Sequence, residues 1–252
     1  MKEKKVAMLP LIALLALLLI QPPVLSQPVP PREETLIVSD SWGAPRGWNP
    51  LASGMTWGWA LMYPSLFFYS TYKDTWIPYL ASGYEWVDEY TILIYLRPEA
   101  KWWDGVPITS EDVVFTWELA KEYNAPWVGA FLPYIESIEA KGTHTVQITL
   151  KKDNLNYFAL FDFLHYAATD GPGGGFIVLP KHRWEKLKAQ YGPRLATDFL
   201  DDNPEQIVGG GPYRLYIWSE DVWYYVRVDN WWGRDIFGLP APKYIAHRTF
   251  KD

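Results

Sequence analysis

The side chains that could catalyse a reaction or hold a metal are few and scattered in this 252-residue sequence, which has no cysteine. The four histidines are His144, His165, His182 and His247, and none falls in the H-x-x-x-H or H-E-x-x-H spacing that places two zinc ligands on one helical face. The serine nucleophile elbow G-x-S-x-G is also absent. The sequence therefore predicts no metal site, no cofactor, no disulfide and no Ser/His/Asp hydrolase.

Adjacent acidic residues form the other candidate chemistry, at Glu111-Asp112, Asp201-Asp202 and Glu220-Asp221. Two carboxylates facing each other across a cleft could cleave a glycosidic bond. Each pair also has a structural explanation: a helix start, a solvated loop and a hairpin turn, respectively. The glycine-rich residues 171–175 and 209–211 match neither the P-loop nor the dinucleotide-binding pattern, so they indicate turns. We expect a protein that is not an enzyme, with a secreted glycosidase as an alternative.

Tryptophan and tyrosine are present in excess, with 15 Trp and 17 Tyr. Both side chains bury a large apolar face and keep one polar edge for a partner. Most of them should lie in the core, and the surplus predicts a cleft lined with aromatic rings. The formal net charge of −6 argues against a nucleic-acid partner, because neutralising phosphates needs clustered Lys and Arg.

Residues 1–26 have the composition of a secretory signal peptide. Three lysines among the first five residues precede an apolar run over residues 6–20. This run is short for a membrane span, which needs about 20 residues. We expect cleavage after Ser26, with a retained membrane anchor as the alternative. In either case the rest of the chain should be extracytoplasmic, in a periplasm or at a cell surface.

Strand and helix patterns are mixed along the rest of the chain without strict alternation, which predicts a mixed α/β (α+β) fold. Strands are expected over residues 34–40, in hairpins over 86–96 and 135–150, and over 213–219, 222–229 and 244–250. Helices are expected over residues 56–68, 110–122, 156–167 and 182–190. The second helix has the clearest start, because Thr109 and Asp112 stand at the spacing of a capping box.

Motifs in two segments carry a family resemblance. Residues 96–117 hold a Leu-Arg strand end, two tryptophans before Asp104-Gly105, and a Thr-Ser-Glu-Asp-Val helix start. Residues 209–233 hold Gly-Gly-Gly-Pro-Tyr and then Asp-Asn-Trp-Trp-Gly. Together with Asn49-Pro50, these motifs resemble, in the same order, those of family 5 extracellular solute-binding proteins, the oligopeptide, nickel and oligosaccharide binders of ABC importers.

The resemblance implies a fold like the type 2 periplasmic binding proteins, with one discontinuous lobe. Residues 27–50 and 153–252 would form lobe I, and residues 51–152 an inserted domain II. In the family a third lobe follows and closes over the ligand. The chain ends at residue 252, so the resemblance implies an N-terminal half in which lobe III is absent.

The resemblance also implies a ligand site, because in the family the loop after the first strand reaches the cleft. The expected ligand-binding residues are Ser53, Gly54, Met55 and Thr56, through backbone groups, and the indoles of Trp42, Trp57 and Trp59. Flat indole faces suit pyranose rings, and core packing is the alternative role for these tryptophans.

The ligand class stays open at this point between oligopeptides and oligosaccharides. The implied partners are the small-molecule ligand and the permease subunits of an ABC transporter, with the binding protein itself a monomer. A free-standing carbohydrate-binding module is a different alternative. It would be an all-β sandwich, and the helix expected over residues 110–122 argues against it.

Overall fold

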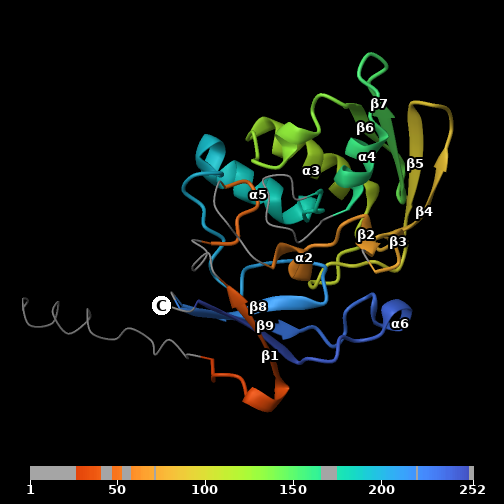
Figure 1. The fold of residues 1–252 in the computed structure, drawn as a ribbon. Helices are drawn as coiled ribbons and strands as arrows, with labels where there is room; N and C mark the ends of the chain where they lie inside the picture. Colours follow the sequence, from red (N-terminus) through yellow and green to blue (C-terminus); the bar gives the residue numbers. More distant parts are fainter. Residues whose placement is uncertain are drawn as a thin grey trace, which may run out of the picture.

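The computed structural model describes residues 27–40, 47–52, 58–70, 72–165, 175–219 and 221–249. This part of the chain contains two four-stranded sheets and one two-stranded sheet. Figure 1 shows one large sheet at the bottom and the other at the upper right. The fold is mixed α/β, as the sequence predicted.

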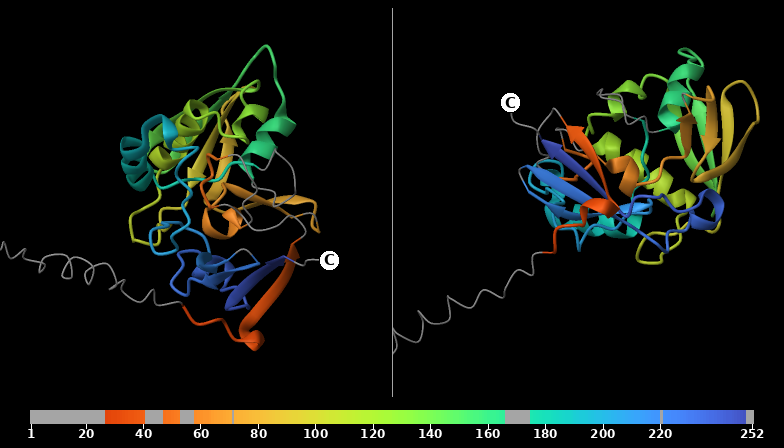
Figure 2. Two further views of the ribbon diagram at one scale, coloured as in Figure 1. Left: turned by 90° about the vertical axis from the view of Figure 1, so that its left-hand side faces the viewer. Right: turned by 60° about the horizontal axis from the view of Figure 1, so that its bottom comes forward.

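The lower sheet joins the two ends of the described chain. Its spatial order is β1 (Thr35–Asp40), β10 (Tyr244–Thr249), β9 (Val222–Arg227) and β8 (Tyr213–Trp218), and a 3-10 turn over Arg32–Glu34 precedes β1. β1 runs parallel to β10, with Thr35 opposite Tyr244, whereas the other neighbours are antiparallel. Figure 2 shows β1, in red-orange, beside the blue strands from the end of the chain. All four predicted strands are confirmed to within two residues.

The upper sheet consists of two hairpins. Its spatial order is β4 (Ala81–Trp86), β5 (Thr91–Leu96), β7 (Thr145–Leu150) and β6 (Ile135–Gly142), all antiparallel. The two central strands, β5 and β7, alternate strictly between buried and half-buried residues. This period of two is expected when one face of a strand meets a core. The hairpin predicted over residues 135–150 is confirmed. The one predicted over residues 86–96 is confirmed in its turn and second strand, but its first strand lies earlier, at Ala81–Trp86.

The helices are short. They are α3 (Ser110–Glu122), α4 (Tyr157–Leu164), α5 (Lys181–Tyr191) and α6 (Arg234–Phe237), with 3-10 turns over Val128–Ala130 and Gly192–Arg194. α3 packs against the upper sheet and against α5. α4 begins where the Asn156 side chain accepts a hydrogen bond from the Ala159 N–H at 3.1 Å. The helix predictions over 110–122 and 182–190 are confirmed. The helix expected over 156–167 is present as α4, which ends earlier, at Leu164, since His165 is extended.

The predicted helix over residues 56–68 is wrong. Its described residues form one turn, α2 (Trp59–Met62), followed by the strand β2 (Phe67–Ser70), which pairs with β3 (Thr75–Pro78). Pro64 explains the early end, because a proline disfavours the helical conformation of the residue before it. Tyr63 is accordingly extended, with φ −114° and ψ 132°.

One hydrophobic core runs through the described chain and contains residues of both large sheets. Five of its largest fully buried side chains are Trp48, Trp102, Trp117, Trp184 and Trp223. Most aromatic residues were expected to lie in the core, and these bulkiest ones do.

Candidate ligand-binding site

The predicted ligand-binding residues fall mostly in segments that the structure does not describe. Trp42, Ser53, Gly54, Met55, Thr56 and Trp57 lie outside the described residues. Trp59, which does lie inside, is the first residue of α2 and is half-buried against the core. Its indole Nε1 is buried and has no hydrogen-bond partner among the described residues.

The chain that leads into residues 53–57 is anchored by Asn49, which is 2% exposed. Its side-chain Nδ2 donates to the carbonyls of Leu195 and Phe199, each at 2.7 Å. Its Oδ1 accepts from the Leu51 N–H at 2.9 Å. Because one buried amide satisfies three backbone groups, the chain before the loop has a fixed position. The sequence had indicated Asn49 only through the family resemblance.

The chain that leaves residues 53–57 is fixed at Gly58, whose φ of 93° favours glycine. A Cβ atom at Gly58 would lie 2.2 Å from the Tyr225 hydroxyl. The same hydroxyl accepts a hydrogen bond from Trp48 Nε1 at 2.8 Å. Both flanks of residues 53–57 therefore meet at Tyr225, on strand β9 of the lower sheet.

The segment after α5, whose Leu195 and Phe199 carbonyls hold Asn49, is itself fixed by a buried ion pair. Arg183, on α5, bonds both carboxylate oxygens of Asp201, one of them at 3.0 Å. Asp201 is 3% exposed, so the prediction of a solvated loop is wrong for this residue. Burial raises the pKa of Asp201, and the neighbouring Arg183 opposes that change. Burial likewise raises the pKa of Tyr63, which lies beside the pair.

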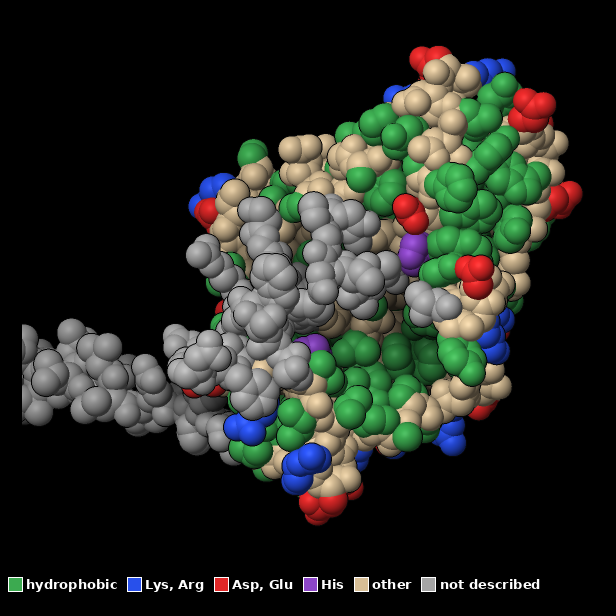
Figure 3. Space-filling view, viewed as in Figure 1, with side chains coloured by type: hydrophobic (Ala, Val, Ile, Leu, Met, Phe, Trp, Pro, Cys, Tyr) green, Lys and Arg blue, Asp and Glu red, His purple; other side chains and the backbone are tan. Residues whose placement is uncertain are grey.

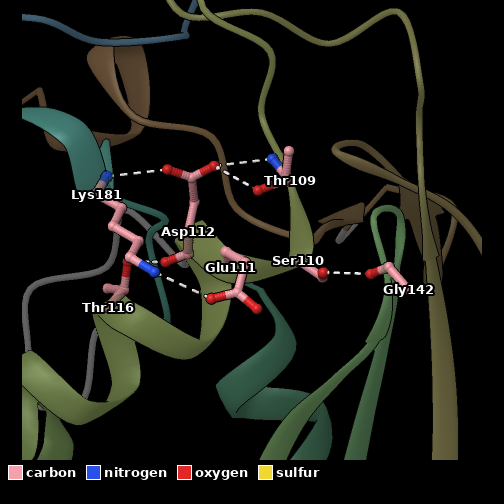
Figure 4. A network of polar contacts seen from close by, with 7 residues as sticks. All are labelled: Thr109, Ser110, Glu111, Asp112, Thr116, Gly142 and Lys181. Atoms are coloured by element: carbon pink, nitrogen blue, oxygen red, sulfur yellow. Dashed lines mark hydrogen bonds and ion pairs between the residues drawn. The ribbon is translucent and has the colours of Figure 1, made fainter.

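A second polar network joins the start of α3 to the start of α5, and Figure 4 shows it from close by. One Asp112 oxygen accepts from the Thr109 N–H at 2.8 Å, and the other accepts from the Lys181 N–H at 2.9 Å. The Lys181 ammonium lies 3.0 Å from the Glu111 carboxylate. The capping box predicted for this helix is confirmed, and Glu111-Asp112 has the structural role that the sequence indicated.

Aromatic side chains also gather around the β2–β3 hairpin, which the sequence had not predicted. Trp76 lies 4.8 Å from Tyr69, 5.5 Å from Phe161 and 4.4 Å from His165, measured between ring centroids. Tyr69 is 38% exposed. Figure 3 shows hydrophobic side chains in a hollow between the upper and lower parts of this face. An apolar hollow of this kind is a suitable place for a ligand.

Two further kinds of feature are absent from the described residues. This part of the chain contains no group of three His, Asp or Glu that could hold a metal ion. It also contains no helix that is long and apolar enough to cross a membrane.

Comparison with known protein families identifies the architecture. The family model described as bacterial extracellular solute-binding proteins, family 5 Middle, matches residues 75–252. The chain belongs to this family. The probable peptide-binding protein YejA of Agrobacterium fabrum is 32% identical over 178 residues, which are 69% of this family 5 chain and 26% of YejA. The peptidoglycan-binding protein YepA of the same organism is 30% identical over 171 residues, which are 63% of this chain and 23% of YepA.

Solved structures of similar proteins have the same fold. A periplasmic oligopeptide-binding protein of Thermotoga maritima, solved with bound mannohexaose, is 29% identical with a TM-score of 0.72, covering 87% of this chain and 38% of its own. OppA of Listeria monocytogenes, solved with a bound peptide, is 22% identical with a TM-score of 0.64, covering 87% and 43%. The family 5 chain therefore has the type 2 periplasmic binding protein fold that the resemblance implied.

The chain spans about a quarter of the length of the curated relatives that it matches, from 21% to 26% for the first three. It spans 38% to 43% of the solved chains named above.

Proposed function

We propose that this family 5 chain is part of an extracytoplasmic binding protein that captures oligopeptides and delivers them to the permease of an ABC importer. The observation that carries the proposal is the family 5 match across residues 75–252. Relatives named as peptide-binding favour peptides as the ligand class. The protein would act by reversible binding, without catalysis, as a monomer.

The proposed division into lobes follows the family. Residues 27–50 and 153–252 form lobe I, and residues 51–152 form the inserted domain II. Two features support this division. The parallel pairing of β1 with β10 brings the two lobe I segments into one sheet. Strands β4 to β7 form a separate sheet within the inserted residues.

The proposed ligand contacts are backbone groups of Ser53, Gly54, Met55 and Thr56, with the indoles of Trp42, Trp57 and Trp59 beside them. The anchoring of both flanks supports this assignment, since Asn49 fixes one side and Gly58 the other. Flanks that are held in place reduce the entropy that is lost when a ligand binds between them. Export would depend on residues 1–26 as a signal peptide, cleaved after Ser26.

Oligosaccharide binding is the second candidate function. The observation in its favour is that the Thermotoga maritima protein, which is 29% identical, was solved with mannohexaose. The tryptophans proposed beside the loop would suit such a ligand, because indole faces pack against the apolar faces of sugar rings.

Titration of the complete protein distinguishes the two ligand classes. Tripeptides to pentapeptides, and cello- and manno-oligosaccharides of similar size, would be added while tryptophan fluorescence is followed. We expect peptides to bind with a Kd of roughly micromolar, about −8 kcal/mol. Binding of sugars alone would favour the second candidate, and no response to either class would refute both.

A matched pair of variants tests the role of the loop. Asn49→Ala leaves the Leu195 and Phe199 carbonyls without their donor, so we expect peptide affinity to fall about tenfold, or about 1.4 kcal/mol. Asn154→Ala removes one exposed hydrogen bond, to Pro133 O at 3.2 Å, and should leave affinity unchanged. Near-ultraviolet dichroism of both variants separates a local effect from unfolding. Equal affinities for the two variants would remove residues 53–56 from the proposed site.

A further inference from the structure

The Tyr63 hydroxyl is a buried polar group without a hydrogen-bond partner among the described residues. Tyr63 directly follows the helical turn α2, and its side chain is fully buried. A buried hydroxyl that has no partner costs free energy, and native proteins keep few such groups. The position of this hydroxyl therefore calls for an explanation, which its surroundings supply.

The hydroxyl lies beside the buried ion pair between Arg183 and Asp201. Burial raises the pKa of Tyr63 most, the Asp201 carboxylate raises it further, and the Arg183 guanidinium opposes both. Because the effect of a charge weakens with distance, the hydroxyl must be close to the carboxylate. A carboxylate offers about four lone-pair sites, and Arg183 donates once to each oxygen. Asp201 can therefore accept a further hydrogen bond, from Tyr63.

The backbone at Asp201 holds one flank of residues 53–57. Asp201 has a φ of 54°, in the left-handed region, which aspartate adopts more readily than most residues. The carbonyl just before it, Leu200 O, accepts from the N–H groups of Trp48 and Asn49, at 2.8 and 3.2 Å. The position of Asp201 therefore affects the chain that enters residues 53–57.

Tyr63 belongs to the other flank. Its N–H donates to Trp59 O at 2.6 Å, which closes the turn of α2 at its end. The ring is packed on all sides, so the hydroxyl moves together with α2 rather than by itself. A small shift of α2 would therefore change the distance between the Tyr63 hydroxyl and Asp201.

We propose that Tyr63 and Asp201 are positioning residues of the proposed ligand site, and that a ligand bound at residues 53–57 completes a hydrogen bond from the Tyr63 hydroxyl to Asp201. This inference rests on the proposed function. The bond would join the two flanks, residues 47–49 and 58–63, through one carboxylate. A ligand can shift a protein between two states only through interactions that differ between them. A hydroxyl that gains its partner when the ligand binds is such a difference.

Tyr63→Phe tests the proposal, because it removes the hydroxyl and keeps the buried ring. The complete protein would be titrated in a calorimeter with the same peptides and oligosaccharides as above. We expect affinity about tenfold weaker than that of the parent, since hydrogen bonds to charged groups are among the stronger ones. The urea midpoint without ligand should equal that of the parent or exceed it, because the ligand-free protein does not use the hydroxyl. A tyrosine that only stabilised the core would show the opposite pattern, a lower midpoint with unchanged affinity.

Tyr79→Phe is the matched control. Tyr79 is also buried, and its hydroxyl likewise has no hydrogen-bond partner within the described chain. Burial alone raises the pKa of Tyr79, with no contribution from a charged neighbour. We expect this variant to bind as the parent does, with a urea midpoint that is equal or higher.

The other outcomes decide against the role of Tyr63. Equal affinities for the two variants overturn the proposal. A lower urea midpoint for Tyr63→Phe without ligand also overturns it, because the hydroxyl would then have a partner before the ligand binds. If Asn49→Ala weakens binding and Tyr63→Phe does not, the proposed function stands and only this inference fails. If the parent binds none of the peptides or oligosaccharides, the proposed function is refuted, and this inference with it.

Discussion

At the scale of single residues, tryptophan N–H groups join segments that are far apart in the sequence. Trp48 donates to the Tyr225 hydroxyl, Trp127 donates to Pro50 O, and Trp218 donates to Asp202 O. Each side chain buries a large apolar surface and directs its single donor to one acceptor. The tryptophan excess therefore has a structural use, and whether part of it lines the ligand cleft stays a prediction.

Asp112 is the residue for which we predict the largest effect on stability at the start of α3. Asp112→Ala leaves the backbone N–H groups of Thr109 and Lys181 without their acceptor in a buried place. At about 1–3 kcal/mol for each of the two unsatisfied groups, we expect a loss of about 2–6 kcal/mol. Urea unfolding of the complete protein, followed by tryptophan fluorescence, would measure it as a lower midpoint.

Glu111→Ala is the matched control on the same helical turn. Its side chain is 59% exposed, and within the described residues its carboxylate pairs with the Lys181 ammonium alone. An exposed ion pair contributes less than about 1 kcal/mol, so the midpoint should hardly move. If both substitutions lowered the midpoint equally, the buried hydrogen bonds of Asp112 would not be what stabilises this junction.

Asp201 and Asp202 are adjacent and identical in type, yet their burial differs, which the sequence did not predict. Asp201 and Asp202 were predicted together as a solvated pair, and only Asp202 is exposed. Asp201 is buried because Arg183, on α5, reaches it through space. Because the burial of Asp201 depends on a partner 18 positions away, it cannot be predicted from the neighbouring residues.

At the scale of elements, prediction succeeded where local chemistry determines the structure. The capping box at Thr109 predicted the start of α3, and the period-two pattern predicted strands β5 and β7. It failed for the helix expected over residues 56–68, where apolar residues around Pro64 fit a helix as well as a strand. Short apolar runs carry no period that separates the two, so the packing of β2 on β3 decided the outcome.

The upper sheet leads to a prediction about hydrogen exchange. β5 and β7 are its central strands, hydrogen-bonded on both sides, whereas β4 and β6 are its edges. Amides that are paired on both sides and buried exchange only through larger openings of the fold. Hydrogen–deuterium exchange mass spectrometry of the complete protein should show slower exchange in Thr91–Leu96 and Thr145–Leu150 than in Ala81–Trp86. Faster exchange in the central strands would contradict the strand order.

At the scale of the whole molecule, the lower sheet depends on a pairing that no local pattern contains. β1 is joined to β10 across more than two hundred residues, from Thr35 to Tyr244. The sequence predicted each strand, but only the family resemblance suggested that the first and last segments share one lobe. A cavity lined by Trp102, Trp103, Trp231 and Trp232 was not predicted either, because its walls come from segments that meet only in the folded chain.

Two N-terminal deletions test this pairing in the complete protein. Removing residues 27–40 takes away β1, whose six residues pair with β10. At about 1 kcal/mol for each backbone hydrogen bond, the loss is on the order of 5 kcal/mol. That approaches the whole stability of a typical domain, about 5–15 kcal/mol. We therefore expect the melting transition of this region to fall steeply or disappear in scanning calorimetry.

The control deletion removes residues 27–34 and keeps β1. It takes away the 3-10 turn and the exposed ion pair between Glu34 and Lys243, which should cost less than about 1 kcal/mol. A large difference between the two deletions means that β1 closes the sheet at its parallel edge. If both proteins melted as the parent does, β1 would contribute nothing to the lower sheet, and the chain before residue 41 would not belong to lobe I.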